Sequence, residues 1–386
     1  MKKIRIITYL LILVLVLSIT SACSDKESSS IQQSEFNKNI IQEEIIKKLS
    51  EGDVAGVSVY IESPKLSEPV FLAEGFADKE NLIKAEPLTK YRIGSITKSF
   101  TGMAILMLHD QVLLNLNDPV TDYLDYKHPY FENITIKEAM NMTTGLKGYI
   151  NDLDEDNPKT MENSLFYNFV ENYPGEKIEP EALLEEAIRI TEIYGIDENK
   201  EFHYSNTNYI ILGMIIEKAS GMSYESFIEK NIIEPLDLNN TIVPYTPELP
   251  ANSAKGYIDF NEDGIKEDMT YLHPSYVWAA GSIISDVQDI GKWMRALASK
   301  ELVSQETLKY FFEEGALARE STIYTAGVIV LNGNDLWHNG TVLGYHGDFY
   351  YDNKTDSVIA ILSNSNSEGI DVTKEIMELI LDEIIK

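Results

Sequence analysis

Residues 92–100 read Arg92-Ile93-Gly94-Ser95-Ile96-Thr97-Lys98-Ser99-Phe100. An apolar run follows at residues 103–108. Gly94 favours a turn out of a short extended segment, which would leave Ser95 at the start of a helix. The three-residue step then places Lys98 on the same helical face, one turn further on.

This spacing has a catalytic and an ordinary interpretation. A serine hydroxyl is a weak nucleophile until a base takes its proton, and a half-buried lysine with a lowered pKa can be that base. The start of a helix adds positive potential where an oxyanion would form. Ser-x-x-Lys also occurs often by chance, so the pattern alone fits equally a helix-capping Ser95 beside an exposed Lys98.

Length and charge limit the class of protein. The chain has 386 residues, enough for one large domain or two ordinary ones. Its net charge of −30 excludes the basic faces that nucleic-acid binding needs. It also excludes docking on anionic lipid through a basic patch.

The N-terminus is predicted to be a lipoprotein signal peptide, residues 1–22. A positive start precedes an apolar run at residues 6–19, which is short for a membrane span. Small residues then lead to Cys23, the chain's one cysteine. This site resembles a bacterial lipobox, although Thr20 stands where Leu is most common. A plain secretory peptide with a stray cysteine is the alternative.

The resemblance implies that Cys23 carries a lipid anchor and that the protein sits on the extracytoplasmic face of the cell membrane. Residues 23–35 are polar and Ser-rich, which predicts a flexible tether.

Residues 36–386 are predicted to fold as an α/β (α+β) unit. Strands at both ends of the chain imply one antiparallel sheet with an inserted helical lobe, and clefts between lobes favour binding sites. The sheet lobe would comprise about residues 36–115 and 275–386, and the helical lobe about residues 116–274. Capping boxes are predicted to begin helices at Thr135 and Ser285. The clearest elements by pattern are a helix from Phe36, strands at 54–62 and 69–77, strands within 324–364 and a helix at 371–386.

Tyr204-Ser205-Asn206 stands just before an apolar helical stretch. A phenol near an ammonium ionises more easily, so Tyr204 could carry a proton between nucleophile and leaving group. The Asn206 amide could donate to a substrate carbonyl and orient the lysine. The ordinary interpretation is a polar helix start capped by Ser205 or Asn206.

His338-Asn339-Gly340-Thr341 forms a third motif on a late strand. Gly340 would let a substrate backbone lie alongside the strand. The Thr341 amide could pair with the Ser95 amide as an oxyanion hole. His338 would be a donor, cationic if its pKa is raised. A surface hairpin with a lone histidine is the alternative.

The three motifs together resemble the serine β-lactamase and penicillin-binding superfamily, in the class C β-lactamase-like branch and closest to serine D-alanyl-D-alanine carboxypeptidases. The resemblance covers about residues 36–386. It implies a β-lactamase/transpeptidase-like fold with a five-stranded antiparallel sheet, no metal and no cofactor. It also implies acylation of Ser95, with Lys98 and Tyr204 handling protons in roles that are disputed across the superfamily.

The third motif departs from the class C pattern, which has Lys-Thr-Gly there. His338 is typical of carboxypeptidase, D-aminopeptidase and esterase-like members, and a weaker cation lowers the expectation of β-lactam hydrolysis. Asn339 replaces the usual threonine, and its side chain should point away from the cleft.

Three further features each allow two interpretations. Residues 259–264 resemble the start of an EF-hand loop, but an acidic turn fits better because the later ligand position is Thr270. His346 could line the cleft or lie in a turn. Trp278 could wall the pocket or pack in the core.

The sequence therefore predicts a lipid-anchored serine hydrolase acting on peptides that end in D-alanine, as in peptidoglycan, with β-lactams as alternative ligands. A D-amino-acid amidase, an esterase or a weak class C-like β-lactamase would use the same residues. A non-catalytic wall-binding or sensor lipoprotein is the rival of another class. The physiological substrate and the oligomeric state are not fixed by the sequence.

Overall fold

The computed structural model describes residues 37–154, 156–319, 321–365 and 371–385. The predicted signal peptide, Cys23 and the whole predicted tether lie outside these residues. No helix of the described chain has the length and apolar character needed to cross a bilayer.

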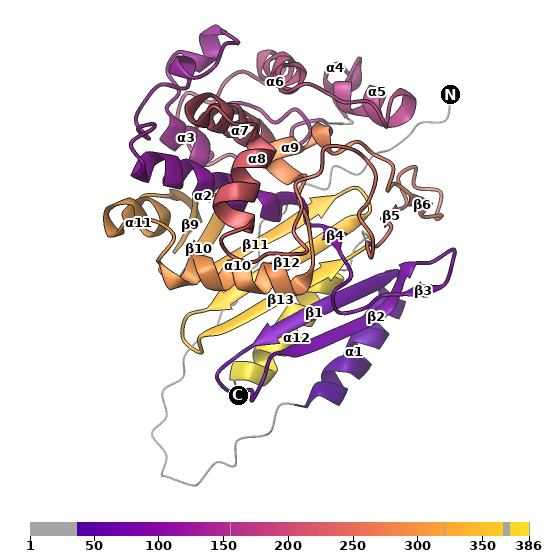
Figure 1. Cartoon of the computed structure of the whole chain (residues 1–386). Coiled ribbons are helices and arrows are strands. Elements are labelled where there is room, and N and C mark those ends of the chain that lie inside the picture. The colour runs from indigo at the N-terminus through magenta and orange to yellow at the C-terminus, as the bar shows by residue number, and fades with distance from the viewer. Residues whose placement is uncertain (1–36, 155, 320, 366–370, 386) are drawn as a thin grey trace.

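Strands near both ends of the chain and a helical middle section form the described molecule (Figure 1). The strands are β1 Gly56–Glu62, β2 Val70–Asp78, β3 Ile83–Lys84, β4 Tyr91–Arg92, β5 Tyr257–Ile258, β6 Glu267–Asp268, β7 Ile284–Ser285, β8 Ala316–Arg319, β9 Thr322–Thr325, β10 Val328–Leu331, β11 Asp335–Val342, β12 Tyr345–Asp352 and β13 Ser357–Ser363. The α-helices are α1 Lys38–Glu51, α2 Thr97–Asp110, α3 Ile136–Met140, α4 Pro158–Met161, α5 Leu165–Asn172, α6 Pro180–Tyr194, α7 Asn206–Ser220, α8 Tyr224–Ile228, α9 Trp278–Gly281, α10 Val287–Ser299, α11 Gln305–Phe312 and α12 Val372–Ile385. Short turns of other helix types are η1 Gly94–Ile96, η2 Val120–Asp122, η3 Pro129–Phe131, η4 Glu229–Ile233 and η5 Pro274–Tyr276.

The main sheet of the described chain has the strand order β3-β2-β1-β13-β12-β11-β10-β9-β8. Antiparallel pairing of β1 with β13, with Val57 opposite Ser363, joins the two ends of the chain as the sequence predicted. The sheet has nine strands rather than the five that the resemblance implied. The two-residue β3 and the four-residue β8, β9 and β10 extend its edges.

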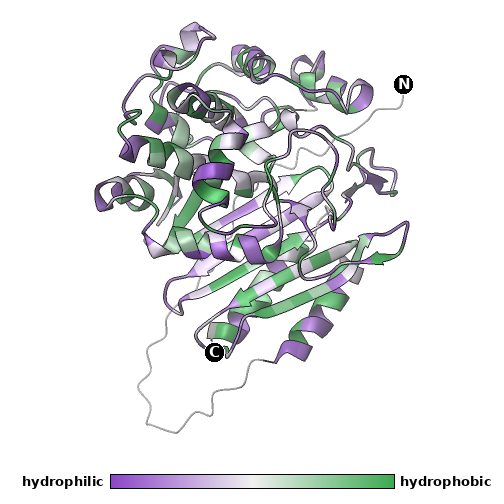
Figure 2. Ribbon diagram, viewed as in Figure 1, coloured by the Kyte–Doolittle hydropathy of each residue, from purple (hydrophilic) through white to green (hydrophobic). Residues whose placement is uncertain are grey.

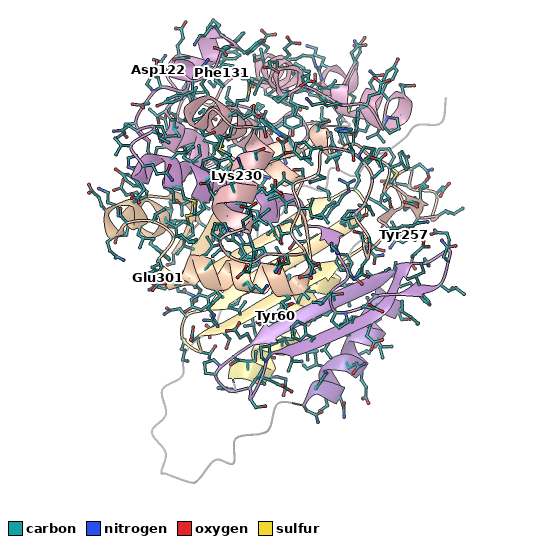
Figure 3. All side chains as sticks on the ribbon, viewed as in Figure 1. Tyr60, Asp122, Phe131, Lys230, Tyr257 and Glu301 are labelled. Atoms are coloured by element: carbon teal, nitrogen blue, oxygen red, sulfur yellow. The ribbon has the colours of Figure 1, made fainter. Side chains whose placement is uncertain are left out.

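The sheet separates two apolar cores. α1 and α12 lie together against one side, which we call the rear face, while α10 packs on the other side, the front face (Figure 1). Rear-face residues Val57, Val59 and Ile61 join the core of α1 and α12. Tyr60 points the opposite way and would touch a side chain added at Gly291 of α10 (Figure 3). This alternation follows from the two-residue period of a strand.

Of the two helix starts predicted from capping boxes, one is found and one is displaced by a residue. Thr135 forms the predicted capping box with Glu138. The helix predicted to begin at Ser285 is instead capped by Asp286, whose side chain accepts from Asp289 N. Ser285 remains in β7, because β7 pairs with β4 immediately before the helix. Figure 2 shows apolar residues along β1 and β2 and mixed polarity on α1, as expected for a helix covering a sheet.

Candidate active site

The turn that carries Ser95 is held against the strand of the third motif. Gly94 has φ +54°, and a Cβ on it would lie 2.7 Å from Thr341 N. A Cβ on Gly340 would lie 1.9 Å from Ile93 O. Both positions therefore require glycine, because a side chain at either would collide with the backbone of the other segment. Gly94 requires it also for its left-handed backbone conformation. Ser95 follows in η1, a 3-10 turn that leads directly into α2.

Ser95 and Lys98 meet as their spacing predicts. Lys98 Nζ lies 2.9 Å from Ser95 Oγ and donates to Ala280 O at 2.7 Å. The Lys98 side chain is fully buried, and burial holds its pKa well below the usual value. An uncharged amine has a lone pair, so the Ser95 hydroxyl can donate its proton to it.

Tyr204 lies beside this pair. Lys98 Nζ is 5.0 Å from the centre of the Tyr204 ring. Burial raises the pKa of Tyr204, and the nearby Ser95 offsets this only in part. The Tyr204 hydroxyl is buried and has no hydrogen-bond partner among the described residues. The prediction that Tyr204 ionises more easily is thus wrong, because burial of the phenol disfavours its charged form.

His338 also adjoins this group, but the raised pKa that would make it cationic is not found. Its ring centre lies 6.2 Å from that of Tyr204, and its Nε2 is 3.3 Å from the Tyr324 hydroxyl. Burial, assisted by Lys98, lowers the pKa of His338 to about 3. The hydrogen bond to the backbone oxygen of Asn339 raises the pKa of His338, but by less than burial lowers it. The imidazole is therefore uncharged at neutral pH.

Gly340 and Thr341 place the strand edge beside Ser95. A Cβ at Gly340 would meet the Ile93 carbonyl, so glycine is needed here to pack the strand against the Ser95 turn. The approach of a substrate backbone along this strand stays a prediction. The Thr341 amide lies next to Gly94, where it can pair with the Ser95 amide as an oxyanion hole. The Thr341 side chain points to the rear face, where its Oγ1 lies 2.7 Å from His346 Nδ1.

Asn206 begins α7 and is buried, and its backbone N–H donates to Asn151 Oδ1 at 2.9 Å. In the described chain, the Lys98 amine bonds to Ser95 and Ala280 and not to Asn206, so the predicted orientation of Lys98 by this amide is absent. The Asn206 Oδ1 atom is buried without a partner in the same residues. Neither Ser205 nor Asn206 caps α7 through its side chain.

Several members of the site left no signal in the sequence. The Ala280 carbonyl that accepts from Lys98 is backbone and has no residue signature. Tyr324 and Tyr209 belong to no motif, yet both are buried near Lys98 or His338. Trp278, expected either to wall the pocket or to pack in the core, is 9% exposed and belongs to the core. Its Nε1 donates to Glu225 at 2.9 Å, and it has an unusual φ of +29° two residues before Ala280.

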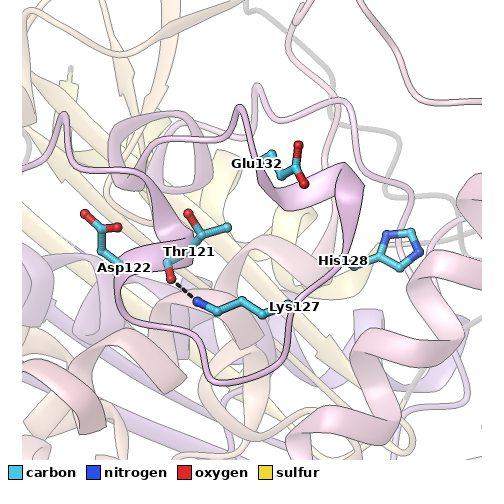
Figure 4. A pocket seen from close by; sticks show the side chains of 5 residues that line it. All are labelled: Thr121, Asp122, Lys127, His128 and Glu132. Carbon is cyan, nitrogen blue, oxygen red and sulfur yellow. Dashed lines mark hydrogen bonds between the residues drawn. The ribbon is translucent and has the colours of Figure 1, made fainter.

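Other sequence features lie away from this centre. His346 lies in β12 on the rear face rather than in the cleft or a turn. Asp259 accepts from the backbone of Asp263 and Gly264, as an acidic turn should. A shallow polar hollow involves none of the Ser95 site and is lined by Thr121, Asp122, Lys127, His128 and Glu132 (Figure 4). Around Ser95, the described residues offer no group of three metal-ligating side chains.

Comparison with known proteins agrees with this arrangement. The sequence profile of the Beta-lactamase family matches residues 43–380. The chain is 27% identical over 338 residues to Protein flp of Staphylococcus aureus (strain N315), covering 83% of this chain and 62% of that protein. The chain thus spans less than two thirds of that relative.

Two solved structures are similar as well. An octameric penicillin-binding protein homologue from Pyrococcus abyssi has a TM-score of 0.71 at 26% identity, covering 89% of this chain and 77% of that one. A D-stereospecific amidohydrolase from Streptomyces sp. has a TM-score of 0.73 at 23% identity, covering 89% and 98%, and this likeness shows the fold alone. Since the family profile runs through the Ser95, Tyr204 and His338 motifs alike, the chain belongs to the Beta-lactamase family of serine hydrolases.

Proposed function

We propose that the protein cleaves peptides ending in D-alanine as a D-alanyl-D-alanine carboxypeptidase, through an acyl-enzyme on Ser95, and that it reacts with penicillin at the same residue. One observation carries the proposal. A fully buried amine whose pKa is held well below its usual value, Lys98 Nζ, lies 2.9 Å from the Ser95 hydroxyl. A serine paired in this way with a base is an activated nucleophile.

Lys98 is favoured over Tyr204 as the acylation base because its Nζ lies 2.9 Å from Ser95 Oγ. In addition, the pKa of Lys98 is lowered while that of Tyr204 is raised. Ser95 Oγ bonds to the substrate carbonyl carbon while its proton passes to Lys98 Nζ. The Ser95 and Thr341 amides stabilise the oxyanion.

The scissile C–N bond then breaks, and the leaving amine takes up the proton. The neutral Tyr204 hydroxyl can relay this proton, by giving its own proton to the amine and regaining one from Lys98 Nζ, so that Lys98 is again a free base. Water, deprotonated by the same base, hydrolyses the ester and frees Ser95.

A second candidate is a hydrolase of D-amino-acid amides or esters. The observation that favours it is the uncharged His338, which provides no cation for a substrate's terminal carboxylate. Arg92, the nearest cation before Ser95 in sequence, instead donates to the carbonyls of Pro247, Thr270 and Leu272. An amide or ester substrate without that carboxylate would need no such cation.

We also propose that the protein acts on the extracytoplasmic side of the membrane, anchored through Cys23. The proposal rests on the charged, apolar and small-residue order of residues 1–23. Metabolic labelling with a palmitate analogue should label the wild type and not Cys23→Ala. Equal labelling of both chains would contradict the anchor.

Mass spectrometry after exposure to penicillin tests the common chemistry. A mass gain on the peptide containing Ser95 is expected in the wild type and in the control Ser299→Ala, but not in Ser95→Ala. Turnover is then ranked on D-Ala-D-Ala peptides, D-amino-acid amides, short-chain esters and nitrocefin. Fastest turnover of the peptides supports the carboxypeptidase, and fastest turnover of amides or esters supports the second candidate. A wild type that neither gains mass nor hydrolyses any substrate contradicts both and favours a non-catalytic wall-binding lipoprotein.

A further inference from the structure

The rear face of the sheet, directly behind the third motif, carries a group of side chains that the proposed reaction does not use. Thr341 on β11 and His346 on β12 are direct cross-strand partners. Their side chains are joined, with Thr341 Oγ1 2.7 Å from His346 Nδ1. The residue whose backbone amide adjoins Gly94 and Ser95 is therefore held from behind through its hydroxyl.

His346 is held in turn by two carboxylates. Its Nε2 lies 3.3 Å from Asp371 Oδ1 and 3.5 Å from Asp348 Oδ2. Trp337 Nε1 donates to Asp348 Oδ1 at 3.0 Å, and the Thr373 hydroxyl donates to Asp348. Both carboxylates therefore have fixed positions around the imidazole.

Asp371 also ties this group to the C-terminal helix. Its Oδ1 accepts from Lys374 N at 3.1 Å, which makes Asp371 the residue that caps the start of α12. The connection thus runs from α12 through Asp371 and His346 to Thr341 and the strand beside Ser95.

The carboxylates give His346 a positive charge. Burial alone would lower its pKa, but Asp371 and Asp348 outweigh burial and raise the pKa of His346 to about 10. On β13 the residue opposite His346 is Ser363, which is uncharged. The other charged groups at the start of α12 are engaged elsewhere, Lys374 near Glu378 and Glu375 with Lys48.

We propose that His346 is a positioning residue of the Ser95 hydrolase. As an imidazolium between Asp348 and Asp371, it holds Thr341 in place and so aligns the amide that stabilises the oxyanion. The inference rests on the proposed function, because it assigns the oxyanion hole to Ser95 and Thr341. Loss of the imidazolium proton would remove the charge attraction to the carboxylates and leave a single N–H to serve either them at Nε2 or Thr341 at Nδ1. The strand edge would then lose its alignment while the substrate pocket kept its shape.

Asp371→Asn removes the negative charge beside His346 but keeps the cap of α12, because asparagine caps helices as well as aspartate does. NMR titration of the wild type and of His346→Gln assigns the His346 signal. The variant should titrate about two and a half pH units below the wild type, so that its His346 is mostly neutral at about pH 8.5.

Penicillin acylation of the same variant provides the functional measurement. The acylation rate constant should fall about tenfold at about pH 8.5 and less than about twofold at about pH 6, relative to wild type. The dissociation constant before acylation should not change. The matched control Glu378→Gln, on the same helix and exposed, should change neither rate nor titration.

Thr341→Val provides a second test that leaves all charges in place. It should lower the acylation rate about tenfold at both pH values while the His346 titration stays high. Two outcomes overturn the positioning role and leave the proposed function intact. In the first, the wild type reacts with penicillin and both variants react at the wild-type rate. In the second, Asp371→Asn slows acylation equally at both pH values. Stoichiometric binding of a divalent ion at His346 also overturns the positioning role. A wild type that reacts with neither penicillin nor a p-nitrophenyl ester overturns the proposed function itself.

Discussion

His338 and His346 lie on neighbouring strands of one sheet and face opposite sides of it. Both are buried or nearly so, yet the pKa of His338 falls to about 3 and that of His346 rises to about 10. The difference lies in their neighbours. His338 adjoins a phenol and an amine, whereas His346 adjoins two carboxylates.

The comparison extends to the two faces. On the front face, burial favours the uncharged form of Lys98, Tyr204 and His338 alike. An uncharged amine can accept the proton of Ser95, so the low polarity of this side is what activates the nucleophile. On the rear face, paired charges hold the same strand in place. Burial alone therefore does not decide the charge of a side chain in this protein.

The largest effect should come from Lys98→Met, which removes the base and keeps an unbranched buried chain. Penicillin acylation should fall about 10³-fold. The free energy of unfolding should change by less than about 1 kcal/mol, because the loss of the hydrogen bond to Ala280 O is offset by removal of a buried amine. Stopped-flow acylation and urea unfolding measure the two quantities. A loss of several kcal/mol would mean that Lys98 is charged and paired, and would break the comparison.

Gly340→Ala should come next, because the new Cβ would lie 1.9 Å from Ile93 O. The strand edge has to move away from the Ser95 turn, and kcat/KM should fall about 10²-fold through misplacement of the Thr341 amide. Gly175→Ala is the matched control, since nothing lies within 4 Å of its added Cβ. Equal activity of both variants would show that the close approach is not needed.

The third prediction compares the histidines directly. The folded-state pKa of His346 is raised, so its contribution to stability is full below about pH 6.5 and is lost as the pH rises toward about 10. The folded-state pKa of His338 is lowered, so its contribution is present above about pH 6.5 and is lost as the pH falls toward about 3.

Urea unfolding at several pH values tests whether the two histidines contribute to stability over these two different pH ranges. The difference in unfolding free energy between wild type and His346→Gln should shrink by about 1.4 kcal/mol per pH unit above pH 6.5 at most. The difference for His338→Gln should change at a similar rate only below that pH. If both differences vary over the same pH range, the two histidines do not differ in charge.

The smallest effect should come from Asn339→Thr. Asn339 lies between His338 and Gly340 and its side chain points away from the front face, so kcat/KM on the fastest substrate should change less than about twofold. Steady-state kinetics measure this. A change of tenfold or more would place Asn339 at the substrate and show that the faces of β11 are assigned wrongly.

Local spacing allowed part of the site to be predicted. Ser95 and Lys98 lie one helical turn apart, so their contact depends on few other residues. The pairing of strands from both ends also follows from the order of elements. The charge of His338 was not predictable, because it depends on Tyr324, Lys98 and complete burial, which come together only in the fold.

Other details escaped prediction for similar physical reasons. The Ala280 carbonyl belongs to the backbone, so no residue type marks it in the sequence. Asp286 rather than Ser285 caps α10, because Ser285 is still paired with Tyr91 in the sheet. The function of His346 depends on Asp371, which approaches it only when α12 packs on the sheet.

The position of β13 has a consequence for biosynthesis. The hairpin of β1 and β2 leaves the ribosome before the helical middle section, but its neighbour in the sheet comes from residues 357–363, which follow that section. Such long-range pairing can form only after the whole segment between the two strands has been made. The Ser95 turn likewise gains its oxyanion partner only once Thr341 has been translated, so shorter nascent chains have no complete catalytic centre.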